Sequence, residues 1–129
     1  MTFTKQELIN KKNEEINTLK EEIRAICFEH IKEHKDLSVG DFIEIPSKNK
    51  FAIFTDLHTE DVDNCVIKTL VLTKLGIPSK RVTTFDLNDV NKIQTSIKDI
   101  VRNNFEGEDF DKKAAIDACL STQLELTNA

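Results

Sequence analysis

Apolar residues recur at heptad-like intervals along the first 36 residues, and nearly everything between them is charged or polar. Intervals of three and four residues place side chains on one face of a helix. Thr4 and Glu7 have the spacing of a capping box, so we expect one long helix that starts there and ends near Asp36. The apolar positions form a seam of Ile9, Ile16, Leu19, Ile23 and Ile26.

This apolar seam is narrower than the apolar face of an ordinary core helix. Lys12 and His30 occupy positions where the heptad pattern requires an apolar residue, and charged residues flank the seam on both sides. Narrow seams are typical of helices that pair with another helix. Phe28 and Ile31 lie off the seam, so we expect the last turns to pack on the rest of the chain. The first turns are expected to project from it.

The remaining residues, 37–129, are predicted to form a compact α+β domain behind an N-terminal helical segment, 1–36. Short β-branched and aromatic runs separated by turn residues predict strands between about residues 41 and 87. Two helices are expected after them, at about 89–103 and 110–124, because apolar residues return there at helical spacing.

The run 65–73 fits two interpretations. Its β-branched residues favour a strand, whereas Gly76-Ile77-Pro78 is also typical of a helix C-cap followed by proline. We favour the strand. Four or five short antiparallel strands then hide their faces and edges best as a small β-barrel or a curled sheet. By analogy, the residues from Val39 to Ile43 are similar to the first strand of an SH3-like barrel, which concerns architecture and implies no function.

Composition limits the classes of partner. The chain has 129 residues, 39% of them hydrophobic and 32% charged, which suits one folded domain rather than disorder or a membrane span. The net charge is −5, and residues 105–129 hold six acidic and only two basic side chains. We therefore expect no membrane partner and no long-range attraction of the whole chain to nucleic acid.

The expected compartment follows from the N-terminus and the thiols. Residues 1–10 lack the apolar stretch of a secretory signal, and three widely spaced cysteines form no C-x-x-C pair. We expect a cytoplasmic protein, in its own cell or in a host cell, or a component of a virion. The many Lys, Asn and Ile residues suit an AT-rich genome, which includes phages.

A metal site is the first chemical hypothesis. Cys27, His30 and His34 share one helical face, and His58 or Cys65 would supply a fourth zinc ligand. Structural zinc sites normally show ligands in closely spaced pairs, so we expect no metal and no cofactor. The acidic stretches 60–63 and 106–111 do not match the order of an EF-hand loop.

Catalysis has little support in the sequence. The chain has no Gly-rich phosphate loop, no G-x-S-x-G and no H-E-x-x-H motif. Cys65 and His58 flank the same loop and are the remaining candidate pair of nucleophile and base. We expect a protein without enzymatic activity.

Two functions remain as hypotheses. The first is an interaction or assembly protein that self-associates, or docks on a partner protein, through the apolar seam; a phage structural or host-inhibiting protein would fit. The alternative is a small nucleic-acid-binding module that contacts phosphates with basic turns. The residues of that alternative are Lys48, Lys50, Lys74, Lys80 and Arg81.

Overall fold

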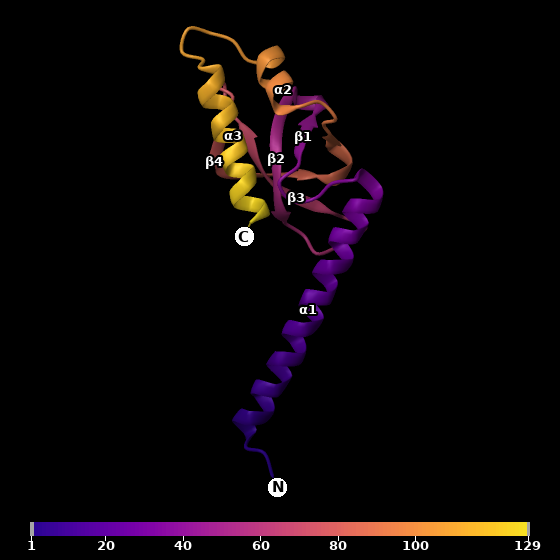
Figure 1. The fold of residues 1–129 in the computed structure, drawn as a ribbon. Coiled ribbons are helices and arrows are strands. Elements are labelled where there is room, and N and C mark those ends of the chain that lie inside the picture. The colour runs from indigo at the N-terminus through magenta and orange to yellow at the C-terminus, as the bar shows by residue number, and fades with distance from the viewer. Residues whose placement is uncertain (1, 129) are drawn as a thin grey trace.

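The computed structural model describes residues 2–128 and shows a long helix attached by one end to a small α+β body (Figure 1). Helix α1 spans Lys5–Lys35. Its first half extends away from the body, and its last turns reach the sheet. The predicted α+β class, with an N-terminal helix, an antiparallel sheet and two C-terminal helices, is confirmed.

Both ends of α1 are capped locally, at the residues where the sequence predicts that the helix starts and ends. At the start, the backbone N–H of Glu7 donates to Thr4 Oγ1 at 3.1 Å. At the end, Asp36 adopts the left-handed conformation, with φ of 55°, and its N–H donates to the carbonyl of Lys32 at 2.9 Å. These two caps satisfy backbone groups that a helix leaves free at its ends.

The sheet is antiparallel, has five strands in the order β4-β3-β2-β1-β5, and is not closed into a barrel. Closure would require the two outer strands to pair. They lie at opposite edges, and β5 contains only two residues. The strands are β1 Phe42–Ile45, β2 Lys50–Leu57, β3 Val66–Leu72, β4 Pro78–Asp86 and β5 Asn91–Lys92.

The ambiguous run 65–73 is a strand, β3. It pairs with both β2 and β4 and buries Ile67 and Thr69 completely. The Gly76 segment that resembled a helix cap is the β3–β4 turn, where Gly76 N–H donates to the carbonyl of Thr73 at 2.9 Å. Gly76 has φ of 74° there, and an added Cβ would lie 3.2 Å from Ala115 Cβ, so the turn requires glycine.

The helix predicted at 89–103 begins later than the periodicity indicates. Helix α2 spans Ile97–Asn104, and Ser96 Oγ accepts the N–H of Asp99 at its start. Residues 87–89 form a 3-10 turn instead, and β5 follows by pairing with β1. Val90 is fully buried in the core without being helical. Pairing with a distant strand therefore overrides the local helical pattern.

The two faces of the sheet pack against different helices. Ala52 and Phe54 of β2 belong to the same core as Cys27 and Ile31 of α1, whereas Ile53 between them points to the opposite face.

Helix α3, Lys112–Thr127, agrees with the prediction at 110–124 apart from its ends.

Hydrogen bonds hold α3 against the body at two places. The thiol of Cys119 donates to the carbonyl of Gly76 at 3.3 Å, and Gln123 Nε2 donates to the carbonyl of Gly40 at 3.0 Å. The helix therefore links the β3–β4 turn to the residues that precede β1.

Two alanine substitutions in α1 test this division of the helix. Ile31→Ala removes a side chain with no exposed surface, and we expect it to lower the free energy of unfolding by about 2–5 kcal/mol. Ile16→Ala truncates the same residue type at a position that is 47% exposed. We expect this substitution to lower the free energy of unfolding by less than about 0.5 kcal/mol. Urea denaturation at low protein concentration measures both. Equal losses would contradict a projecting first half.

Candidate interaction surface on the N-terminal helix

The apolar seam of α1 is exposed over its whole length. The exposed fractions are 51% for Ile9, 47% for Ile16, 57% for Leu19, 44% for Ile23 and 57% for Ile26. Large aliphatic side chains gathered along one line of a helix are unusual on a free surface and mark interaction sites. The five residues predicted as partner-binding therefore form one exposed strip, interrupted by Lys12 between Ile9 and Ile16.

The body holds α1 by a different face of the helix. Cys27 is 2% exposed, Ile31 is fully buried, and the Phe28 ring packs against Phe54 with centroids 6.3 Å apart. With 3.6 residues per turn, Phe28 and Ile31 lie about a quarter of a turn or more from Ile23, whereas Cys27 lies only about 40° from it, at the border of the seam. The body therefore anchors the helix without covering Ile23 or Ile26.

An ion pair reinforces this anchor. Arg24 Nη2 donates to Asp56 Oδ1 at 2.8 Å, and Arg24 Nη1 lies 3.7 Å from Glu60 Oε1. The Arg24 guanidinium also lies over the Phe28 ring, 5.5 Å from its centroid. Burial acts to raise the pKa of Asp56, but the hydrogen bonds from Arg24 and from the Leu57 N–H outweigh it. The pKa of this carboxyl therefore lies below its ordinary value.

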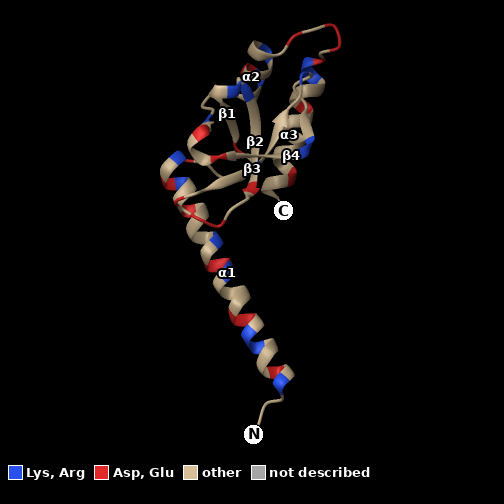
Figure 2. Ribbon diagram, turned by 180° about the vertical axis from the view of Figure 1, so that it is seen from behind, with Lys and Arg blue, Asp and Glu red and all other residues tan. Residues whose placement is uncertain are grey.

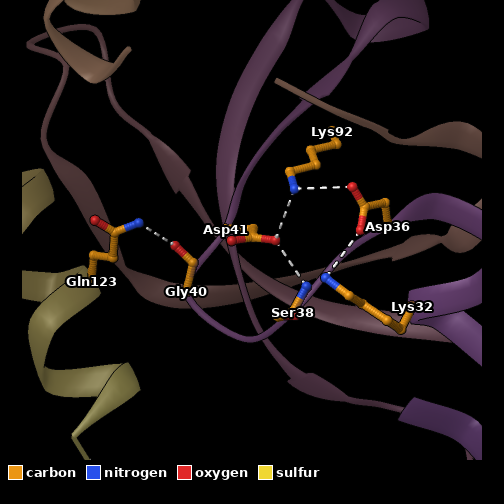
Figure 3. Close-up of polar contacts among 7 residues, drawn as sticks. All are labelled: Lys32, Asp36, Ser38, Gly40, Asp41, Lys92 and Gln123. Carbon is orange, nitrogen blue, oxygen red and sulfur yellow. Dashed lines mark hydrogen bonds and ion pairs between the residues drawn. The ribbon is translucent and has the colours of Figure 1, made fainter. Parts of the chain in front are cut away.

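A second polar cluster fixes the end of the helix (Figure 3). The Asp36 carboxylate forms two ion pairs. Lys32 Nζ lies 3.0 Å from Asp36 Oδ1, and Lys92 Nζ, from β5, lies 3.3 Å from Asp36 Oδ2. Lys92 Nζ also lies 3.9 Å from Asp41 Oδ2, which accepts the N–H of Ser38 at 2.9 Å. The two lysines lower the pKa of Asp36. The turn between α1 and β1 is therefore tied to the edge of the sheet, which sets the direction in which α1 leaves the body.

The residues predicted as weak metal ligands do not come together as a ligand set. The rings of His30 and His34 stack with centroids 5.0 Å apart, while Cys27 is buried in the core between α1 and the sheet. Burial raises the pKa of the Cys27 thiol, which disfavours the thiolate that zinc requires. Across residues 2–128, no group of three His, Cys, Asp or Glu side chains is placed to hold a metal ion.

The thiols have the environment of core residues. Burial raises the pKa of Cys65, and it raises the pKa of Cys119 to about 11. His58 is exposed, and its backbone N–H donates to the carbonyl of Val66. A reactive cysteine needs a lowered pKa, so the geometry does not favour a nucleophile at Cys65.

The basic turns are only partly assembled. Lys50 and Lys74 line one groove, together with Phe51 and Phe105, because the β1–β2 and β3–β4 turns lie at the same end of the sheet. Lys48 is in the first of these turns. Lys80 and Arg81 lie on β4, an exposed edge strand, where charged side chains commonly prevent strand pairing.

An acidic segment adjoins these basic turns. Phe105 and Phe110 stack with centroids 6.2 Å apart, and both lie beside Gly76 in the β3–β4 turn. The segment between them, residues 106–109, contains three acidic side chains and joins α2 to α3, where Figure 2 shows it as a red loop. Negative charge next to the groove weakens its attraction for phosphate.

Comparison of the chain with protein families, curated proteins and solved structures found no match. Within residues 2–128, no helix combines the length and the apolar character that crossing a membrane requires.

Replacing Asp56 with asparagine tests the ion pair that anchors α1. Asp56 and Arg24 are 40% and 38% exposed, so solvent screens the pair. We therefore expect Asp56→Asn to lower the free energy of unfolding by about 0.5–1 kcal/mol at pH 7. Because the folded-state pKa of Asp56 is lowered, its contribution is present above the unfolded value near 3.8 and is lost as the pH falls through the folded value. Urea denaturation of both proteins between pH 7 and pH 2 should show the difference vanish in acid. A constant difference would contradict the pairing.

Proposed function

We propose that this protein is a non-enzymatic interaction protein that binds a helix, of a second copy or of a partner protein, through the apolar seam of α1. The observation that carries the proposal is that Ile9, Ile16, Leu19, Ile23 and Ile26 remain exposed on a projecting helix. Exposure of five large aliphatic residues in one line costs free energy unless a partner covers them.

The rest of the chain supports this reading because the body is complete without the seam. Its core contains residues from α1, the sheet and the segments that join them. Among residues 2–128, every buried side-chain nitrogen or oxygen has a hydrogen-bond partner. Among these residues, the body therefore leaves no buried polar side chain that needs a partner from outside.

The helix itself also favours a partner. Helices in water are stabilised mainly by packing of an apolar face, because intrinsic propensity alone is marginal. The turns of α1 before Arg24 are exposed on all sides, so α1 depends on its caps and its anchored end. A narrow seam with a spacing of three and four residues matches the groove of another helix.

We place this interaction in the cytoplasm, in the protein's own cell or in a host cell. The three cysteines are free and buried, and they fit a reducing compartment.

Two glutamate substitutions on opposite faces of α1 test the proposal. Ile16→Glu places a charge in the seam, and Thr18→Glu places the same charge about 200° further round the helix. We expect Ile16→Glu to weaken association at least tenfold, because a buried unpaired charge costs more than about 1.4 kcal/mol. Thr18→Glu should behave as the unmodified chain does.

Light scattering reports association between copies, and affinity capture from the native source reports a partner protein. Association or capture that survives Ile16→Glu would contradict the proposed function.

A further inference from the structure

We infer that the partner of the seam is a second copy of this chain, with the two α1 helices parallel and in register. The inference rests on the proposed function and deepens it. A two-fold symmetric pair uses the same strip on both copies, so each seam residue meets its own counterpart. The residue types, the flanking charges and the placement of the body all bear on this choice.

The seam residues suit a parallel pair of helices. If Ile9 is assigned to heptad position a, then Ile16 and Ile23 also occupy a, and Leu19 and Ile26 occupy d. β-Branched residues at a with leucine at d favour two-stranded parallel packing. The sequence has this arrangement over the central heptad, from Ile16 to Ile23.

The charges beside the seam select the parallel orientation. Glu15 and Glu22 fall at position g, and Lys20 falls at position e. In a parallel pair, a g residue faces the e residue five positions later in the other copy, so Glu15 faces Lys20 twice by symmetry. In an antiparallel pair, g faces g, which sets Glu15 against Glu22 twice. Complementary charges thus occur in one orientation and repulsion in the other.

Lys12 fits the same arrangement. It occupies a d position in the seam, and its ammonium group already reaches Glu15 Oε2 of its own helix at 3.3 Å. In the parallel pair, the two Lys12 stems can lie along the seam while each charge stays beside a glutamate. In the antiparallel pair, Lys12 would pack against Ile23. A single polar residue in a seam commonly fixes register.

The bodies do not obstruct this pairing. Each body contacts α1 through Arg24, Phe28 and Ile31, and it reaches the border of the seam at Cys27, which occupies position e. Two-fold symmetry places the second body on the opposite side of the helix pair. Ile23 and Ile26 keep 44% and 57% of their surface exposed beside the body. The seam is therefore accessible from Ile9 through Ile26.

Charge reversal tests the facing pair of Glu15 and Lys20. Lys20→Glu sets like charges against each other in a parallel dimer, and we expect it to weaken association about fivefold to tenfold at low salt. The double variant Glu15→Lys with Lys20→Glu restores opposite charges across the pair, so association should recover. Sedimentation equilibrium from about 1 µM to about 1 mM covers the affinities expected of short helix pairs. A double variant as weak as Lys20→Glu would contradict the facing pair.

Cross-linking of the full-length chain decides the orientation. Ile9→Cys should form a disulfide between copies on oxidation with glutathione disulfide, whereas Lys11→Cys, on the far side of the helix, should not. The native cysteines are buried, so the unmodified chain is the background control. A mixture of Ile9→Cys and Ile26→Cys chains should form no mixed disulfide, because these positions face each other only in an antiparallel pair.

The outcomes separate this inference from the proposed function. A chain that stays monomeric up to 1 mM, or a dimer joined by the mixed 9–26 disulfide, would overturn the parallel dimer. The proposed function fails on a different result, namely that Ile16→Glu changes neither association nor capture.

Discussion

The packing of the last turns of α1 against β2 is the contact on which the rest of the account depends. Cys27 and Ile31 enter the core beside Phe54, and Arg24 binds Asp56 on the same strand. Because a helix is rigid over this length, anchoring one face of its end decides which face of the remaining turns meets solvent. The apolar seam is therefore presented outward by the way the body holds the helix, and its exposure follows from the fold.

Local signals made most of the fold predictable. The N-cap of α1 involves residues three positions apart, so Thr4 could be identified from the sequence, and the change of pattern after Asp36 indicated where the helix ends. The start of α2 could not, because Val90 joins the core and Asn91 pairs with Glu44 of β1, nearly fifty residues earlier. Periodicity alone does not show such pairing. Periodicity also could not show that the sheet stays open, because closure depends on which edge strands pair.

The candidate sites divide in the same way. The seam was predictable because all its members lie on one helix. The anchor pair was missed, since Arg24 looks like any exposed charge until Asp56 is placed beside it, 32 residues later. Conversely, the spacing of Cys27, His30 and His34 gave them one helical face but did not make them ligands, because the body buries Cys27 and leaves His34 exposed. Likewise, the basic turns meet at one end of the sheet, but an acidic loop lies next to them.

Native mass spectrometry of the unmodified chain, over a range of concentrations, tests the central claim most directly. The account predicts a species of twice 14.7 kDa, without added mass, whose share rises with concentration as the two seams cover each other. A chain that remains at 14.7 kDa at every concentration would contradict pairing between copies.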